Sequence, residues 1–348
     1  MHSLQKIGLL TFFAVSFYSC KEDELPTADG PTPYPLVIPA SLPGFPIPND
    51  NPLTVEGVEL GRKLFYDPIL SGNNTQSCGS CHNQGDGFTD HQLQYSTGID
   101  GISGDRNSMP LFNIGYARDF FWDGGATTLE SQAVAPIVNP IEMHEDIVNA
   151  LGELSSHPEY PALFKKAFST DSITISLVMK AIAQFERTLL SGNSKYDRYV
   201  RGQATLTPQE QNGLTVYRAA AKGDCTHCHT LGGTFTDFGY RNTGLDSIAA
   251  DSGRARITLN PLDLGRFKTP TLRNISVTAP YMHDGRFATL QEVLDHYNTG
   301  FHYPVNLDPN LRAAVKGRMS AQEMADLIAF LETLTDTDFL TNPAYGQP

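Results

Sequence analysis

The stretch SCGSCHNQGDGFTD, residues 77–90, decides how this chain folds. A second stretch, DCTHCHTLGGTFTD at residues 224–237, nearly repeats it. In each, a Cys-x-x-Cys-His motif is followed, six residues after its His, by Phe-Thr-Asp. A helical turn places positions i, i+3 and i+4 on one face, so the two thiols and the imidazole of each motif can act together.

Three kinds of site compete for this motif. A zinc ribbon needs two neighbouring Cys-x-x-Cys pairs, and these two pairs lie far apart in the chain. A redox Cys-x-x-Cys needs no following His, yet both copies have one. Attachment of haem c explains every residue, because each thiol can form a thioether with a haem vinyl group while the His binds the iron. The predicted haem-binding residues are Cys78, Cys81, His82, Cys225, Cys228 and His229.

The N-terminus predicts export. Residues 1–20 hold an apolar run too short to span a bilayer comfortably, which is typical of a signal peptide. Cys20 at its end resembles the acylated Cys of a bacterial lipoprotein, and the alternative is ordinary cleavage with Cys20 discarded. We therefore expect a periplasmic or cell-envelope protein, lipid-anchored through Cys20. Residues 21–52 carry nine prolines and predict an extended tether.

Composition limits the function classes. The chain has 348 residues, 40% of them hydrophobic, which fits a globular protein with two domains. Its net charge of −13 argues against nucleic acid as a partner. No other segment is apolar enough to span a membrane, so the expected membrane contact is the lipid anchor alone.

An internal repeat supports two related domains. FNIGYARDFFWDGGATTL (112–129) matches RNISVTAPYMHDGRFATL (273–290) at a constant offset of 161. Helical apolar patterns close each copy, at 175–190 and 324–334. TPQE (207–210) and SAQE (320–323) have the form of capping boxes. We predict an all-α fold of two related c-type cytochrome domains with long irregular loops, at 53–203 and 204–348.

Several long motifs, in order, resemble the bacterial di-haem cytochrome c peroxidase family, including its methylamine-utilisation maturases. They are the two Cys-x-x-Cys-His segments, FFWDGGATTLESQAVAPIVNPIEM (120–143) and FKTPTLRNISVTAPYMHDG (267–285). The resemblance covers roughly residues 55–335. It implies two covalent haems c, of which the N-terminal one reacts with hydrogen peroxide and the C-terminal one relays electrons. It also implies a small electron donor, such as a cytochrome c or a cupredoxin, and often a homodimer.

The resemblance assigns catalytic roles to Glu142 and Gln132, the pair above the peroxide site. One carboxylate can take a proton from the inner peroxide oxygen and return it to the outer one. Gln132 can orient the peroxide. Taken without the family, Glu142 is a solvated turn residue after Pro140.

Further roles follow by the same matching. Trp122, the only Trp of the chain, falls where the family mediates electron transfer between the haems, and it can also serve as a core anchor. A calcium ion is implied at Asn107, Thr278 and Pro280, the last two binding through backbone carbonyls.

Two departures from the peroxidase pattern matter. Many members carry a second His on the N-terminal iron, but the loop at 96–107 has none, and His91 suits a surface or loop-packing residue. We therefore predict an N-terminal haem that is already open. Where ordinary members have a Met ligand on the C-terminal haem, the count reaches Tyr297, the residue type of the maturase branch. His296 and Met282 are rival ligands, and Tyr297 as a packing residue is the other alternative.

Three functions remain. The first is a cytochrome-c peroxidase that reduces hydrogen peroxide to water. The second is a maturase-like oxidase that modifies side chains of a partner protein through high-valent haem, which Tyr297 and the missing His favour. The third is a plain di-haem electron carrier, which has no use for a carboxylate above an open iron.

Overall fold

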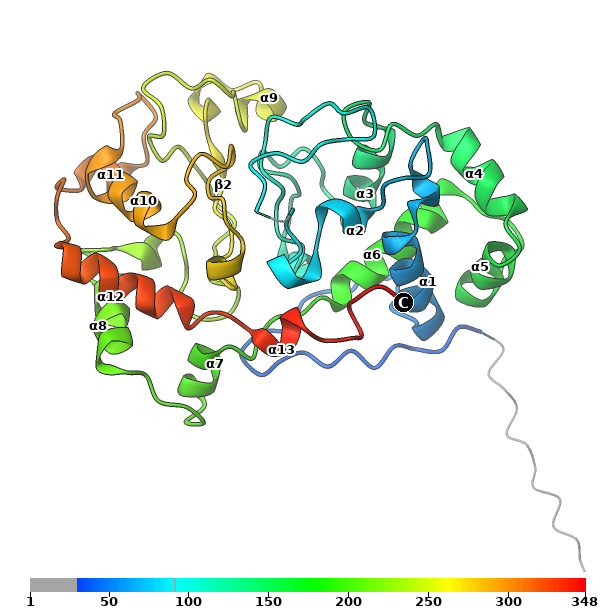
Figure 1. The fold of residues 1–348 in the computed structure, drawn as a ribbon, viewed down its shortest axis with the longest axis horizontal. Coiled ribbons are helices and arrows are strands. Elements are labelled where there is room, and N and C mark those ends of the chain that lie inside the picture. The colour runs from blue at the N-terminus through cyan, green and yellow to red at the C-terminus, as the bar shows by residue number, and fades with distance from the viewer. Residues whose placement is uncertain (1–29, 91) are drawn as a thin grey trace, which may run out of the picture.

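The computed structural model describes residues 30–90 and 92–348. Cys20, the expected signal peptide and His91 therefore lie outside the described residues. The fold is mostly α, as predicted, with long loops between helices (Figure 1). The helices before residue 190 are α1 Val55–Tyr66, α2 Cys78–Cys81, α3 Leu129–Val138, α4 Ile147–Ser156, α5 Tyr160–Phe168 and α6 Ile175–Thr188.

The later helices are α7 Lys195–Val200, α8 Pro208–Arg218, α9 Ala255–Thr258, α10 Leu290–Asp295, α11 Pro309–Ala313, α12 Ala321–Glu332 and α13 Thr337–Leu340. Two short strands, β1 Tyr240–Arg241 and β2 Phe267–Lys268, pair antiparallel. Below, "first half" means the part built around α1 and α6, and "second half" the part built around α8 and α12. Within the described residues no helix is long and apolar enough to cross a membrane.

Each half is built on one close helix pair. In the first half, a Cβ placed on Gly61 of α1 would lie 1.9 Å from the carbonyl oxygen of Ala181 in α6. In the second, a Cβ on Gly213 of α8 would lie 1.9 Å from the carbonyl oxygen of Asp326 in α12. Only glycine allows backbones to approach so closely. The capping boxes expected at the starts of α8 and α12 are confirmed.

A turn that occurs once in each half is hydrogen-bonded to the chain just after a long helix, α6 in the first half and α12 in the second. Asn113 and Asn274, paired by the internal repeat, both adopt left-handed backbone with φ of 57° and 53°. The backbone N–H of Asn113 donates to Leu189 at 2.8 Å, just after α6, and that of Asn274 donates to Leu334 at 3.1 Å, just after α12. Asn tolerates this conformation better than most residues with a side chain. The repeat in sequence is therefore a repeat in structure.

The described part of the expected tether, residues 30–52, has no helix and contacts the rest of the protein at several points. Its start pairs with α1, where the Thr32 backbone N–H donates to Glu56 at 2.8 Å. Its middle contacts the chain beyond α6, since the hydroxyl of Ser41 donates to the Gly192 carbonyl at 2.6 Å. Its end is buried at Asn51. Proline content predicted an extended tether, but it did not show these contacts.

The two halves exchange their ends. Tyr196 of α7 belongs to the apolar core of the second half, together with Phe330 of α12. Phe339 of α13 belongs to a core of the first half, and Figure 1 shows the C-terminus lying beside α1 and α6. The division near residue 203 stays a prediction. The helix α7, which precedes residue 203, packs in the second half, and α13, which follows it, packs in the first half.

Candidate active site

The first Cys-His motif forms a short helix, as expected. Ser77 precedes α2, which carries Cys78 and Cys81, and His82 follows directly. Nδ1 of His82 lies 2.8 Å from the carbonyl oxygen of Phe88. That contact fixes Nδ1 as the donor and leaves Nε2 free to bind a metal. Burial lowers the pKa of His82, which keeps the imidazole in its neutral, ligating form.

The second motif has the same arrangement, but the distance between its His Nδ1 and the carbonyl acceptor is longer. Cys225 starts a 3-10 turn, and the backbone N–H of His229 donates to its carbonyl at 2.8 Å. Nδ1 of His229 lies 3.3 Å from the carbonyl oxygen of Phe235. Burial lowers the pKa of His229 to about 4. Both motifs therefore present a neutral imidazole whose Nδ1 faces a backbone carbonyl.

The donor set fits covalent haem at both motifs. All four described cysteines are free thiols rather than disulfide partners. Burial raises the pKa of Cys78 to about 12 and that of Cys225 to about 12, so both remain uncharged. Cys78 packs in the first half and Cys225 in the second, so the two pairs serve separate sites, as haem attachment requires and a shared zinc ribbon does not.

Glu142 lies close to the first motif. Burial is the main cause that raises the pKa of Cys81, and the charges of Asp90 and Glu142 add to it, so Glu142 lies within electrostatic range of the first motif. The carboxylate accepts a hydrogen bond of 2.7 Å from the amide of Asn139. Burial raises the pKa of Glu142, and the Asn139 bond opposes that change only in part. The interpretation of Glu142 as a fully solvated turn residue does not fit this burial.

Gln132 reaches the same side through helix geometry. It is half-buried on α3, seven residues before Asn139. Two helical turns separate these positions, so they lie on one face of the helix. Thr128 and Ser131 cap the start of α3 reciprocally and fix its direction. The amide of Gln132 therefore lies on the α3 face that leads to Asn139, the hydrogen-bond partner of Glu142.

The loop at 96–107 covers the Glu142 turn. The backbone N–H of Ile99 donates to the Glu142 carbonyl at 2.9 Å. A Cβ on Gly98 would lie 2.3 Å from the carbonyl oxygen of Ile141, so the loop approaches closely only because this residue is glycine. Nearby His144 bonds to Asp100 at 2.5 Å, with both side chains about half exposed. The open N-terminal haem stays a prediction.

Trp122 lies at the junction of the halves. Its side chain is buried, and its indole N–H donates to the carbonyl of Asn107 at 2.9 Å. Its own carbonyl accepts from the backbone N–H of Lys268 in β2 at 2.8 Å. Packing and electron transfer both remain compatible with this position.

The residues matched to calcium are only partly placed together. Asn107 is buried, its backbone N–H donates to His283 at 2.8 Å, and its side-chain amide donates to two backbone carbonyls at 3.2 Å. Thr278 packs beside Gly87 of the first half. Both residues therefore bridge the halves, while the calcium ion itself stays a prediction.

Tyr297 lies beside the second motif. Its pKa is raised mainly by burial, and the charges of Cys228 and Cys225 add to that effect. Nε2 of the rival His296 lies 3.0 Å from the backbone carbonyl of Thr243, so that nitrogen already has a partner. Both residues belong to one π-helical turn, His296–Gly300. Met282 lies in the turn that leads to His283. These contacts favour Tyr297 among the three candidates.

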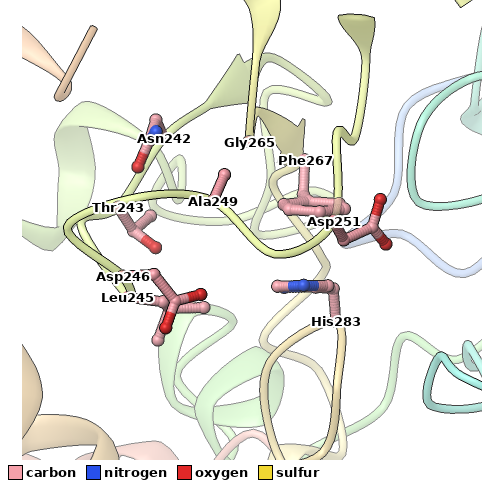
Figure 2. A pocket seen from close by; sticks show the side chains of 9 residues that line it. All are labelled: Asn242, Thr243, Leu245, Asp246, Ala249, Asp251, Gly265, Phe267 and His283. Atoms are coloured by element: carbon pink, nitrogen blue, oxygen red, sulfur yellow. The ribbon is translucent and has the colours of Figure 1, made fainter. Parts of the chain in front are cut away.

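A polar cluster at the junction was not expected as a unit. His283 stacks on Phe267 with ring centroids 3.6 Å apart, in a pocket that Asp246 and Asp251 also line (Figure 2). Arg106 pairs with Asp251 at 2.6 Å and with Asp123 of the first half at 2.7 Å. In the sequence, His283 matches a pocket-loop His of the resembled family and pairs with Trp122 in the internal repeat, and both observations pointed to this place.

Comparisons with known proteins agree with this geometry. Residues 55–205 match the family model of di-haem cytochrome c peroxidase. The methylamine utilization protein MauG of Methylorubrum extorquens is 37% identical, over 83% of this chain and 81% of its own length. The cytochrome c551 peroxidase of Nitrosomonas europaea is 34% identical, over 86% of each chain. A crystal structure of a MauG-like protein associated with microbial copper homeostasis matches with a TM-score of 0.83 at 35% identity, over 89% of this chain and 98% of that one.

Proposed function

This chain belongs to the di-haem cytochrome c peroxidase family, which also contains MauG, and on that premise we propose that it reduces hydrogen peroxide to water. One peroxide consumes two electrons and two protons and yields two waters. The electrons come from a small redox protein, a cytochrome c or a cupredoxin. Each half is proposed to be a c-type cytochrome domain. Haem bound at each motif supplies the redox chemistry.

The observation that carries the proposal is the half-buried Glu142, whose charge acts on Cys81 of the first motif. As a carboxylate it takes the proton of one peroxide oxygen, and as a carboxylic acid it returns that proton to the oxygen that leaves as water. Burial raises the pKa of Glu142, which makes the protonated form easier to reach than at an exposed carboxyl. Gln132, on the α3 face that also carries Asn139, orients the peroxide by hydrogen bonding.

A specific observation also supports maturase-like oxidation of a partner protein. Tyr297 lies beside Cys225 and Cys228, where the maturase branch uses a Tyr ligand. A tyrosinate is a hard anionic ligand that lowers the haem potential relative to Met. Such a haem suits storage of oxidising equivalents better than fast relay. Peroxidase ranks first because Glu142 and Gln132 serve both activities, whereas no feature of the chain identifies a protein substrate.

The proposal also includes the expected export, calcium ion and homodimer. Export to the periplasm or cell envelope with a lipid on Cys20 places the enzyme where small redox carriers operate. A calcium ion at Asn107, Thr278 and Pro280 would tie the halves together. A homodimer follows from the family alone.

Steady-state turnover of peroxide with reduced cytochrome c or cupredoxin tests the proposal on the protein with both haems attached. Fast turnover supports peroxidase function. Slow turnover with a long-lived oxidised form of the protein favours the maturase-like alternative. Absence of any reaction with peroxide would leave the electron carrier.

A further inference from the structure

The chain crosses between the halves at a buried anion. Asp336, which caps α13, is 2% exposed, and its carboxylate accepts backbone N–H bonds of 2.8 Å from both Gly192 and Asn193. Its own backbone N–H donates to the side chain of Asn274 at 2.8 Å. These bonds tie the end of α12 to the chain that leaves α6. The direction of the last twelve residues is thus fixed at their start.

Beyond this crossing, the C-terminal segment packs behind the first motif. The ring of Phe339, 3% exposed, lies with its centroid 5.7 Å from that of Phe88. Gln84, two residues after His82, donates its amide to the carbonyls of Phe339 at 3.0 Å and Asn342 at 2.8 Å. The C-terminal segment therefore contacts the short loop between His82 and Phe88 at both of its ends, through Gln84 and Phe88.

That loop needs such support. Phe88 has a left-handed backbone with φ of 59°, a conformation that is unfavourable for a residue with a side chain and persists only when its surroundings impose it. Its carbonyl is the acceptor that orients His82. A ring packed against Phe88 therefore acts, through this carbonyl, on the orientation and basicity of the imidazole.

The second half has the reciprocal arrangement. Phe235, whose carbonyl faces His229, has φ of 53° and packs against Tyr196 with ring centroids 5.6 Å apart. Tyr196 comes from α7, the helix that follows α6 of the first half, just as Phe339 comes from α13, which follows α12 of the second. Each half thus contributes one aromatic residue to the loop whose carbonyl faces the His of the other half's motif.

We propose that Phe339 and Tyr196 are positioning residues, exchanged between the halves, that set the ligand strength of His82 and His229 respectively. Each keeps the carbonyl of its Phe partner in place to accept from imidazole Nδ1. The inference rests on haem attachment alone, so it stands or falls independently of peroxide turnover.

The test uses the full-length protein with both haems attached. Midpoint potentials of the two haems are measured by optical and paramagnetic-resonance titration in Phe339→Leu, Tyr196→Leu and the control Phe164→Leu. Phe164 is a fully buried ring of α5, in a core cluster with residues of α1, α3, α4 and α6 that contains no residue of the loops after His82 and His229. A weaker Nδ1 bond makes the imidazole a poorer donor, so the potential of the affected haem rises.

We expect Phe339→Leu to raise the potential of the N-terminal haem only, and Tyr196→Leu that of the C-terminal haem only. Phe164→Leu should move neither. Unchanged potentials in both exchanged variants, or an equal shift in Phe164→Leu, would overturn the proposal. Gln84→Ala removes two bonds to the same segment without touching either ring, so it carries the test for the first half if Phe339→Leu does not fold.

Discussion

The carboxylate of Glu142 accepts a hydrogen bond of 2.7 Å from the side-chain amide of Asn139, three residues earlier in the chain. The two residues close the turn that follows α3, and Glu142 is half-buried there. Burial raises the pKa of this carboxyl, while the Asn139 bond stabilises its charged form and lowers it. The balance between these two effects sets the pH at which Glu142 can accept a proton.

Replacing Glu142 by Gln should slow the reaction with peroxide by about 10²–10⁴, the usual contribution of a positioned acid–base group. Haem content and resting spectra should be unchanged, because the amide keeps the size of the side chain. Rapid mixing with peroxide measures the rate constant. A rate within a few-fold of the parent would remove Glu142 from the chemistry.

The pH dependence has a predicted sign. Glu142 must be ionised to accept a proton, so the rate falls as the pH falls through its raised pKa. Asn139→Ala removes the bond that favours the carboxylate and should move this acid limb to higher pH, by less than about one unit for a bond worth about 1 kcal/mol. Rate constants for the reaction with peroxide, measured across the acid pH range, give the position of the limb in the parent and in Asn139→Ala. A limb that moves to lower pH would contradict the assignment.

If Tyr297 is the proposed ligand, Tyr297→Phe should raise the midpoint potential of the C-terminal haem, because a tyrosinate ligand is anionic and the Phe ring is not a ligand. The ring remains, so packing beside Cys225 and Cys228 changes little. His296→Ala is the matched comparison, since this imidazole bonds to the Thr243 carbonyl. If His296→Ala alters the low-spin spectrum and Tyr297→Phe does not, the ligand assignment is wrong.

Sequence alone located both cytochrome motifs because thiol and imidazole spacing is local. The same holds for the capping boxes and for α6, predicted at 175–190 and observed at Ile175–Thr188. The repeat at Asn113 and Asn274 was visible because one conformation needs the same residue twice.

What sequence did not show depends on contacts between distant segments. α13 is four residues long, too short for any helical period, and Phe339 meets Phe88 from the far end of the chain. The bound path of residues 30–52 likewise depends on partners such as Gly192. The burial of Glu142 follows from the approach of the loop at 96–107, which no pattern within the motif predicts.

Glu186 gives a prediction on stability. Its side chain is 4% exposed on α6, and one carboxyl oxygen has no hydrogen-bond partner among the described residues. Burial raises its pKa to about 8 from an ordinary value of 4.5. The folded state therefore holds a proton that the unfolded state releases between these two pH values. Stability should fall across that window as the pH rises, by at most about 1.4 kcal/mol per pH unit from this group.

Glu186→Gln should flatten this decline and stabilise the protein most near pH 8, because the amide mimics the neutral acid. Chemical denaturation at several pH values measures the effect. Glu332→Gln, at the exposed C-terminal end of α12, is the control and should leave the pH profile unchanged. Parallel profiles for the parent and Glu186→Gln would show that this carboxyl is ionised in the folded protein.

The paired glycines give the last prediction. In Gly61→Ala and Gly213→Ala, the new methyl group would lie 1.9 Å from a backbone carbonyl oxygen of the facing helix. A backbone atom cannot rotate away as a side chain can, so the helices must separate. We expect each variant to lose about 1–3 kcal/mol of unfolding free energy, the cost of overpacking.

Gly152→Ala, on α4 with nothing within 4 Å of the new methyl, should instead gain about 0.5–1 kcal/mol, because alanine restricts the unfolded chain. Denaturant unfolding of the three variants with both haems attached measures these changes. Equal stability of Gly61→Ala and Gly152→Ala would show that α1 and α6 do not cross as closely as described, and the same comparison with Gly213→Ala tests α8 and α12.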